Sequence, residues 1–461
     1  FLPCVAKSNR MNSQAIMLRH RLCVKAKKSG AMILAHAVLE KNTNSVTGVW
    51  SRKNGKIMAV GSGILSELFP VSGVRIGIAE AGIRKTNRKD LVIFELAADS
   101  AVAATFTTNA FCAAPVHVAK KHLTLDVCRY WLINTGCANA GTGEQGMQDA
   151  LQSCDALAKI TAVKPESILP FSTGVIGELL PMERLVGGLP KALADLDANH
   201  WLRAAEGIMT TDTRPKAASK KISIDGNIIT VTGISKGAGM IKPNMATMLG
   251  FVATDAKVSQ EDLHALLKSV VNKSFNRITI DGDTSTNDAC MFAATGKSGV
   301  VLSPASPQWN IFAQAVENIF TELAQAIVRD GEGATKFITV EINGGNSSAE
   351  CLRAAYAIAE SPLVKTALFA SDPNWGRILA AIGRSGIENL DTSRINIFLN
   401  DVQIVQNGGR ATSYTEEQGQ RAMAPEEIIV RVELQRGVAS ETVWTCDFSH
   451  DYVTINAEYR T

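Results

Sequence analysis

The sequence predicts a mixed α/β or α+β fold in which helices cover sheets, and three observations lead to this prediction. Short apolar runs of strand length, such as residues 92–96, recur along the chain. Longer segments, such as residues 306–330, carry apolar residues at three- and four-residue spacing, which is typical of an amphipathic helix. The two kinds of segment alternate without a repeat or a low-complexity tract, so strands and helices are expected to pack as layers.

The first half of the chain is expected to contain two buried strands, a helix and a hairpin. The strands lie at residues 92–96 and 131–134, and the hairpin lies at residues 222–234, where residues alternate in polarity around the turn sequence Asp-Gly-Asn at 225–227. The helix is expected over residues 147–163, with one apolar side formed by Leu151, Leu157 and Ile160.

The second half is expected to begin with two helices and to continue with strands. Residues 261–275 and 306–330 have helical spacing. Residues 337–342 and the apolar run at 428–434 are expected to be strands. The second helix should bury one apolar face, made of Phe312, Val316, Ile319, Phe320, Leu323 and Ile327.

Composition and charge exclude several classes of protein. No segment of this chain of 461 residues approaches the run of about 18 apolar residues that a membrane span requires. Residues 1–57 hold 11 Lys and Arg residues and one acid, Glu40, which leaves 36 basic and 43 acidic residues in the remainder. This mildly acidic remainder has no basic footprint for nucleic acid. We therefore expect a soluble protein that binds neither nucleic acid nor a membrane.

The first 57 residues differ from the rest and are excluded from the fold prediction. Their excess of Lys and Arg and their lack of aspartate fit an organellar transit segment, which would place the protein in an organelle matrix. We favour the alternative that they are translated sequence upstream of a native start near Met58. The expected location is then the cytoplasm.

The cysteines indicate a reducing compartment, and no metal site is expected. Their number is odd, no pair has C-x-x-C spacing, and the seven histidines are dispersed. In a chain of this length such cysteines are expected to be free thiols. They are Cys4, Cys23, Cys112, Cys128, Cys137, Cys154, Cys290, Cys351 and Cys446.

The segment 236–250 is rich in glycine, is stiffened by Pro243 and contains Ala246 followed by Thr247. A threonine hydroxyl is a weak nucleophile unless a base lies beside it, and the residue's own α-amine can be that base. A free α-amine titrates at about 7.7–8.0, but at Thr247 it exists only if the bond to Ala246 is cut. The sequence therefore predicts self-cleavage into chains 58–246 and 247–461, which should share one core because neither has the pattern of a free-standing domain.

Two other motif matches suggest different chemistry. Residues 233–237 match G-x-S-x-G, which would make Ser235 the nucleophile of a serine hydrolase, but the glycines and the proline that follow discourage the helix that this motif requires. Residues 141–146 match G-x-G-x-x-G, but six residues separate them from the preceding strand, whereas the dinucleotide motif follows its strand directly. We prefer a helix-capping turn there, with contact to a coenzyme phosphate as the alternative.

Five segments combine glycine, hydroxyl and charged residues in distinctive ways: Phe171-Ser-Thr-Gly-Val-Ile-Gly177, Met209-Thr-Thr-Asp-Thr213, Lys236-Gly-Ala-Gly-Met240 with Pro243-Asn-Met-Ala-Thr-Met-Leu249, Arg329-Asp-Gly-Glu-Gly-Ala-Thr-Lys336, and Ser371-Asp-Pro-Asn-Trp-Gly-Arg377. In sequence and in order they resemble the motifs of the ornithine acetyltransferases, also called glutamate N-acetyltransferases, of arginine biosynthesis. The resemblance runs from about residue 58 to residue 461. Position 242 departs from it, because relatives often have histidine where this chain has lysine.

The resemblance implies a self-processing acetyltransferase whose two cleaved chains jointly build a layered α/β sandwich and form a heterotetramer of two α and two β chains. Thr247 would take acetyl from N²-acetylornithine and pass it to glutamate by a ping-pong mechanism. Thr173 and Gly174 would form the oxyanion hole. No cofactor is implied, and the sequence leaves open whether acetyl-CoA is also a donor. The implied substrate contacts are Thr210, Lys236, Thr247, Glu332, Asn456 and Thr461.

The charges of the two substrates raise a question that the resemblance does not answer. Lys236 suits the α-carboxylate of acetylornithine and Glu332 suits its δ-ammonium, but Glu332 would repel the side-chain carboxylate of glutamate. Lys336 and Arg377 are candidates to bind that carboxylate. The main alternative function is a self-processing amidase or aminopeptidase, in which water replaces glutamate as the acceptor.

Overall fold

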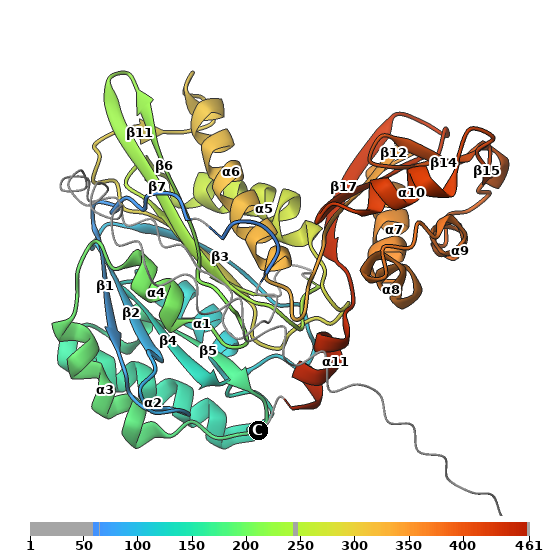
Figure 1. Cartoon of the computed structure of the whole chain (residues 1–461). Helices are drawn as coiled ribbons and strands as arrows, with labels where there is room; N and C mark the ends of the chain where they lie inside the picture. Colours follow the sequence, from blue (N-terminus) through green and yellow to red (C-terminus); the bar gives the residue numbers. More distant parts are fainter. Residues whose placement is uncertain (1–58, 64, 243–247, 459–461) are drawn as a thin grey trace, which may run out of the picture. The chain divides into compact units, whose positions relative to one another are not determined.

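The computed structural model describes residues 59–63, 65–242 and 248–458, all within one unit that spans residues 47–461 (Figure 1). Two sheets in this unit are stacked face to face, and helices cover the outer face of each sheet. These layers confirm the predicted α/β sandwich. None of the helices in the described residues has the length and apolar character that a membrane crossing requires.

The first sheet has four strands and is covered on its outer face by three helices, α1 (Ala114–Leu125), α2 (Gly143–Thr161) and α3 (Met182–Ala194). The two strands expected at 92–96 and 131–134 are both present and lie side by side in its centre. In spatial order the strands are β1 (Val74–Ala79), β2 (Leu91–Leu96), β4 (Tyr130–Cys137) and β5 (Ile168–Val175).

The second sheet has five strands, and α5 (Gln260–Lys273) and α6 (Trp309–Arg329) cover its outer face. Strands from both sides of residues 243–247 are interleaved in it, because β10 and β8, which follow this segment, lie between β3 and β7, which precede it. The sheet therefore cannot be built from either side of this segment alone. In spatial order its strands are β3 (Ala101–Phe106), β10 (Ala289–Ala294), β8 (Leu249–Thr254), β7 (Asn227–Lys236) and β6 (Lys216–Ile224).

Aromatic side chains fill the space between the two sheets. Phe94 and Trp131 from the first sheet meet Phe251 from the second, with ring centroids 5.6 Å and 5.5 Å from that of Phe251. Trp201 of the short helix α4 (Trp201–Gly207) packs edge-on against Phe94. Because such large rings contribute much of the buried apolar area, they fix the spacing of the two sheets.

A third sheet of six strands lies in the C-terminal part of the chain, with a separate apolar cluster against its helices. The strand predictions at 337–342 and 428–434 fall on β12 and β16, which pair in parallel. The strands are β15 (Gly409–Arg410), β14 (Val402–Gln406), β13 (Asn396–Leu399), β16 (Glu427–Glu433), β12 (Phe337–Gly345) and β17 (Ala439–Cys446). The helices of this part are α7 (Ser348–Ala359), α8 (Pro362–Phe369), α9 (Trp375–Gly383), α10 (Glu416–Met423) and α11 (His450–Ala457). A separate two-stranded sheet earlier in the chain is formed by β9 (Lys257–Val258) and β11 (Val301–Leu302).

The hairpin and the two helices predicted around the middle of the chain are present. In the turn between β6 and β7, Asp225 and Gly226 have φ angles of 50° and 80°, as a type I′ hairpin turn requires. The helix predicted at 261–275 is α5. The helix predicted at 306–330 is α6, and all six residues of its expected apolar face are buried.

The predicted apolar side of α2 is wrong. Leu151 and Ile160 are 40% and 47% exposed, and only Leu157 of the three is buried. Leu151 and Leu157 are six positions apart, which places them on different sides of a helix with 3.6 residues per turn. The buried face instead carries small residues at helical spacing, with Ala150 and Cys154 preceding Leu157.

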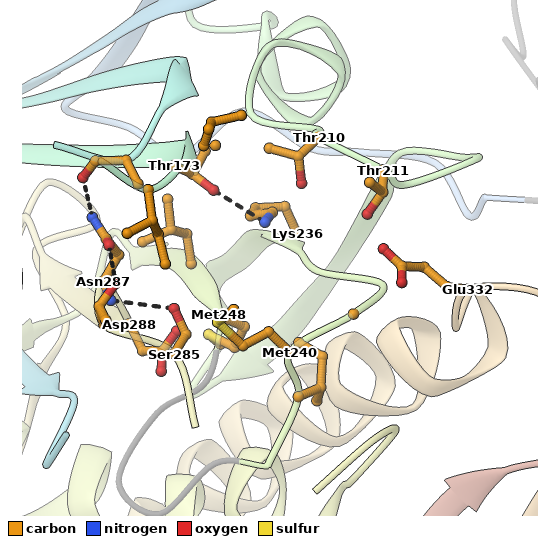
Figure 2. A pocket seen from close by; sticks show the side chains of 18 of the residues that line it. Thr173, Thr210, Thr211, Lys236, Met240, Met248, Ser285, Asn287, Asp288 and Glu332 are labelled. Carbon is orange, nitrogen blue, oxygen red and sulfur yellow. Dashed lines mark hydrogen bonds between the residues drawn. The ribbon is translucent and has the colours of Figure 1, made fainter. Parts of the chain in front are cut away.

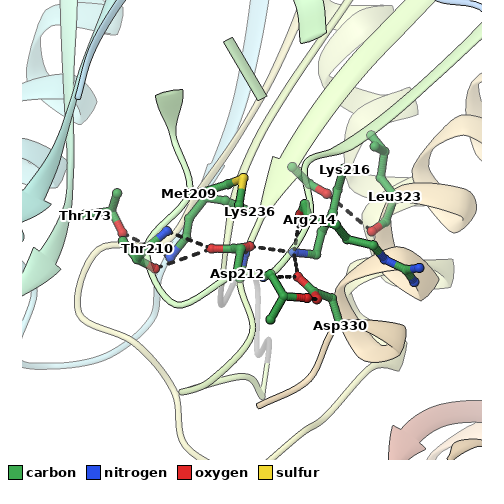
Figure 3. Close-up of polar contacts among 12 residues, drawn as sticks. Thr173, Met209, Thr210, Asp212, Arg214, Lys216, Lys236, Leu323 and Asp330 are labelled. Atoms are coloured by element: carbon green, nitrogen blue, oxygen red, sulfur yellow. Dashed lines mark hydrogen bonds and ion pairs between the residues drawn. The ribbon is translucent and has the colours of Figure 1, made fainter. Parts of the chain in front are cut away.

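A buried chain of three charges joins the second sheet to the loops beside it (Figure 3). The Lys216 Nζ atom at the start of β6 lies 2.6 Å from Asp212 Oδ1 and 2.6 Å from Asp330 Oδ2. Asp212 lies in the loop after α4, and Asp330 directly follows α6. The lysine side chain is 1% exposed and the two carboxylates are fully buried, so three segments meet at one desolvated ion cluster.

The attraction within this cluster favours the charged forms of Asp212 and Lys216. Burial by itself raises the pKa of Asp212, but the ammonium groups of Lys216 and Lys236 outweigh it and hold that pKa below its usual range. Burial likewise opposes the charge of Lys216, yet Asp212 and Asp330 raise the pKa of this lysine. The carboxylates also bind main chain: Asp212 accepts hydrogen bonds from the N–H groups of Thr210 (2.8 Å) and Gly237 (2.7 Å).

We expect Lys216→Met to lower the free energy of unfolding by about 3–5 kcal/mol, because it leaves two carboxylates buried without their partner. Urea denaturation followed by circular dichroism measures the change. Lys273→Met is the matched control, since Lys273 pairs with Glu317 while its side chain is 58% exposed, and it should cost at most about 1 kcal/mol. Equal losses in the two variants would contradict the importance given to the buried cluster.

Candidate functional site

A cavity of about 250 Å³ lies where β5, β7 and β8 meet the loops around them (Figure 2). All of the predicted oxyanion-hole and substrate-contact residues that the structure describes line it. They come from distant parts of the sequence, and they are Thr173, Gly174, Thr210, Lys236, Glu332 and Asn456. Ala246, Thr247 and Thr461 lie outside the described residues, although Met248, the next residue after Thr247, also lines the cavity.

The predicted oxyanion segment is held in a conformation that requires glycine at position 174. Gly174 has a φ angle of 137°, and a Cβ atom there would lie 2.2 Å from the carbonyl carbon of Gly136 on the neighbouring strand. The register of β4 and β5 shifts at this place. From the other side, the side-chain amide of Asn287 donates to the carbonyl of Ser172 at 3.0 Å. The main chain on either side of Thr173 is therefore fixed.

Lys236 is the cation of the cavity, and it lies between the oxyanion segment and the buried ion cluster. Its Nζ atom donates to Thr173 Oγ1 at 3.1 Å. Burial lowers the pKa of Lys236, and the nearby carboxylate of Asp212 opposes this shift. The lysine ends β7, and the Asp212 carboxylate accepts a hydrogen bond from the next N–H group, that of Gly237. One carboxylate thus supports both the charge and the position of this side chain.

Glu332 supplies a carboxyl group on the side of the cavity opposite Thr173, with Lys236 between them (Figure 2). It is 6% exposed, and its Oε2 atom accepts a hydrogen bond from the side chain of Asn456 on α11 at 2.8 Å. Burial raises the pKa of Glu332 above its ordinary value. The cavity therefore offers a cation and, on the side opposite Thr173, a weakly acidic carboxyl, which suits a substrate that carries charges at both ends.

The chain that leads to Pro243 is held on both sides. The carboxylate of Asp281 accepts hydrogen bonds from the N–H groups of Met240 (2.6 Å) and Ile241 (2.8 Å). The hydroxyl of Thr284 donates to the carbonyl of Lys242 at 3.1 Å. The Lys242 ammonium, at the position that departs from the family pattern, pairs with Glu360 at 2.9 Å and does not line the cavity.

Sequence reasoning missed one wall of the cavity, which consists of the four residues 285–288. They connect Asp281 to the start of β10, and Asn287 donates to the carbonyl of Ala138 at 2.6 Å. Asp288 is 3% exposed, and burial raises its pKa well above the ordinary value. The sequence feature that could have indicated this wall is the polar run Asp-Gly-Asp-Thr-Ser-Thr-Asn-Asp at 281–288, directly before a buried strand.

The two residues suggested for the glutamate side chain do not line the cavity. Lys336 donates to the carbonyls of Met423 and Pro425, and Arg377 donates to the carbonyl of Leu363. Both cations are used within the third sheet and its helices. The structure therefore gives no support to either residue as a substrate contact.

The two competing motifs have structural explanations. Ser235 is buried within β7 and donates to the carbonyl of Leu323 at 3.3 Å, and no helix follows it in the described residues up to 242. It therefore lacks the exposed turn of a nucleophile elbow. Residues 141 and 142 lead directly into α2, residues 143–146 are its first turn, and Thr142 donates to Asn139. The segment therefore opens the helix, as preferred from the sequence, but the Thr142 side chain makes no capping hydrogen bond to the helix. No cluster of three metal-binding side chains occurs in the part of the chain that the structure describes.

Comparison with known proteins identifies the family. The ArgJ family model matches residues 75–461. The bifunctional arginine biosynthesis protein ArgJ of Pseudomonas syringae is 59% identical over 406 residues, which cover 88% of this chain and 100% of that protein. The protein of the same name from Pseudomonas fluorescens is 59% identical over 412 residues, with the same coverage of both chains.

Two solved structures are also similar. Arginine biosynthesis bifunctional protein ArgJ from Bacillus halodurans has 38% identity and a TM-score of 0.43, covering 44% of this chain and 95% of that chain. Ornithine acetyltransferase from Mycobacterium tuberculosis, solved in complex with ornithine, has 31% identity and a TM-score of 0.34, covering 38% of this chain and 94% of that chain. The family match and the two full-length relatives confirm the resemblance found in the sequence: the chain belongs to the ArgJ family of bifunctional arginine biosynthesis proteins.

Proposed function

We propose that this chain cuts itself between Ala246 and Thr247 and then transfers acetyl from N²-acetylornithine to glutamate. The observation that carries the proposal is the convergence of six predicted residues, from five separate segments, on one cavity next to Met248. A chance grouping would not bring an oxyanion-type turn, a cation and a carboxyl together beside the residue that follows the predicted nucleophile. Membership of the ArgJ family supports the same reaction class.

Self-cleavage creates the catalytic residue. The hydroxyl of Thr247 attacks the carbonyl carbon of Ala246, the peptide nitrogen leaves, and water hydrolyses the resulting ester. Thr247 then has a free α-amine that can act as the base for its own hydroxyl. The antiparallel pairing of β7 with β8, in which Lys236 lies opposite Leu249, would keep the two new chain ends in one sheet.

Transfer then proceeds in two steps through an acetyl ester of Thr247. Each step passes through a tetrahedral oxyanion, which the Thr173 hydroxyl and the N–H of Gly174 would stabilise. One such donor typically contributes about 10²–10³ in rate. The fixed positive φ angle of Gly174 and the Lys236–Thr173 hydrogen bond support this role, because an oxyanion hole must be rigid before the charge develops.

The raised pKa of Glu332 offers an answer to the conflict between the two substrates. In its ionised form Glu332 pairs with the δ-ammonium of acetylornithine. In its protonated form it no longer repels the side-chain carboxylate of glutamate, and it can donate a hydrogen bond to it. Lys236 holds the α-carboxylate in both cases, with Thr210 beside it on the cavity wall.

The remaining assignments extend this reaction. We propose acetyl-CoA as a second acetyl donor, which the word bifunctional in the names of the relatives supports. We propose a heterotetramer of two α and two β chains, and a cytoplasmic location. Seven free cysteines in the described residues, six of them buried, support a reducing compartment.

An amidase or aminopeptidase is the second candidate function. It differs from the transferase because it would consume acetylornithine without glutamate.

Intact mass tests the nucleophile directly. We expect wild-type protein to give two fragments that meet at Ala246 and Thr247, and Thr247→Ala to remain one chain. Ser235→Ala is the matched control, since it also removes one hydroxyl close to the cleavage segment, and it should be cut normally. An uncut wild-type chain, or a cut Thr247→Ala chain, would contradict the mechanism.

The two substrates should depend on pH in opposite directions. As the pH falls through the raised pKa of Glu332, protonation removes the partner of the δ-ammonium, so KM for acetylornithine should rise while KM for glutamate falls. Glu332→Gln should abolish both trends and raise KM for acetylornithine about 10–100-fold, the value of a charge-assisted hydrogen bond. Steady-state kinetics at several pH values measure this, and parallel trends for both substrates would refute the role of Glu332.

The C-terminal segment should be needed for transfer and not for cleavage. Deletion of residues 456–461 removes Asn456, which holds Glu332, and Thr461. We expect two fragments of normal mass from this variant and no measurable acetyl transfer. Normal transfer by the shortened protein would show that these residues are not part of the site.

A further inference from the structure

The proposed reaction needs a group that stores one proton between its two halves. In the first half, the amide nitrogen of acetylornithine becomes an ammonium and gains two protons. One comes from the Thr247 hydroxyl, and the other must come from an acid in the cavity. In the second half, the ammonium of glutamate loses two protons: one returns to Thr247, and the other needs a base. The α-amine of Thr247 can move the hydroxyl proton, but it does not supply this additional one.

Asp288 has the environment that such a group requires. It lines the cavity next to Ser285, on the side opposite Glu332 (Figure 2). Its side chain is almost completely buried, and Ser285 hydrogen-bonds to the carboxyl. The Oδ2 atom, however, has no hydrogen-bond partner among the described residues. A buried polar atom without a partner calls for an explanation, and a catalytic role is one such explanation for an atom that lines a cavity.

The main chain places Asp288 close to Met248, the residue that follows the predicted nucleophile. The next residue, Ala289, pairs with Leu249 in the parallel register of β10 and β8, and its N–H donates to the carbonyl of Met248 at 3.0 Å. Thr247 is the residue directly before Met248 in the chain. The amine that is cleaved from the acetyl group, or attacks it, must lie next to the Thr247 hydroxyl. The pairing of β10 with β8 therefore brings Asp288, which directly precedes β10, close to the residue that follows the predicted nucleophile.

The other charged groups that face the cavity are already engaged. The Lys236 ammonium donates to Thr173 and is stabilised by the buried carboxylate of Asp212. Glu332 accepts its hydrogen bond from Asn456 on the opposite wall. Burial raises the pKa of Asp288 well above its ordinary value, and Ser285 and the ammonium of Lys236 oppose this shift only in part. A carboxyl whose pKa is raised toward neutral pH is suited to exchange a proton with a substrate.

Building on the proposed transfer reaction, we propose that Asp288 is a catalytic acid and base that exchanges one proton with the α-amine of the substrate. In the first half, the bond between the acetyl carbon and the ornithine nitrogen breaks, and the Asp288 carboxyl gives its proton to that nitrogen. In the second half, the Asp288 carboxylate takes a proton from the glutamate ammonium, and the free amine attacks the acetyl ester. The Thr247 oxygen leaves with its own proton, and Asp288 is again neutral.

Two acetyl donors with different leaving groups test this role. N²-acetylornithine releases an amine that must be protonated, whereas p-nitrophenyl acetate releases a phenolate that leaves without a proton. Asp288→Asn keeps the size of the side chain but has no proton to give. Without glutamate, the rate at which chain 247–461 gains the mass of one acetyl group should fall about 10²–10⁴-fold with acetylornithine. With p-nitrophenyl acetate it should stay close to the wild-type rate.

Asp255→Asn is the matched control. Asp255 is also buried, its pKa is also raised by burial, and it accepts a hydrogen bond from the Thr230 N–H at 2.9 Å, but it does not line the cavity. This variant should acetylate at the wild-type rate with both donors. Equal losses with both donors in Asp288→Asn would mean a purely structural role, and no loss with either would mean no role. Both results overturn the proposal.

A second measurement uses wild-type protein alone and decides the question if Asp288→Asn fails to fold or to cut itself. At saturating concentrations of both donors, where the Glu332-dependent binding of acetylornithine no longer affects the rate, acetylation by acetylornithine should slow relative to acetylation by p-nitrophenyl acetate as the pH rises and Asp288 loses its proton. A ratio of the two rates that does not change with pH would overturn the role of Asp288 while leaving the transfer reaction intact. A wild-type protein that is uncut and gains no acetyl group would instead overturn the proposed function itself.

Discussion

The carboxylate of Asp212 is the contact on which the geometry of the site depends. It binds the Lys216 ammonium within the second sheet and the N–H of Gly237 at the end of β7, and Lys216 in turn holds Asp330. Asp330 lies two residues before Glu332, so the anion and the cation of the cavity are positioned by one buried ion cluster. Because its members have almost no contact with solvent, none can lose its partner without leaving a desolvated charge.

The second sheet explains how a cut chain can remain one enzyme. In this sheet β7 precedes the predicted cleavage site and β8 follows it, and the two are hydrogen-bonded neighbours. The apolar cluster behind them combines residues from both sides of the site, such as Val231 with Val252 and Phe292. Cleavage would therefore release a new α-amine at the cavity without separating the halves that build it. The proposed chemistry needs a new chain end, and β8 begins two residues after the predicted one.

Much of the fold and of the site could be predicted from the sequence, because strong periodicity and local motifs carry that information. The parts that failed depend on packing between distant segments. On α2, small residues such as Ala150 face the sheet while Leu151 points to solvent, a choice that hydrophobicity alone does not reveal. The spacing of Asp212 and Lys216 resembles an exposed helical pair, yet both are buried in and beside a strand. Within the polar run at 281–288, only the tertiary structure distinguishes Asp288 as the carboxyl with an unpaired oxygen.

The central claim is that a threonine with a free α-amine carries the acetyl group within this cavity. Its most direct test is to incubate the cleaved protein with N²-acetylornithine in the absence of glutamate and to map the modified residue by peptide mass spectrometry. The account predicts one acetyl group, as an ester on the Thr247 hydroxyl, that disappears when glutamate is added and reappears as N-acetylglutamate. No bound acetyl group, or one on another residue such as Ser235 or Lys236, would contradict it.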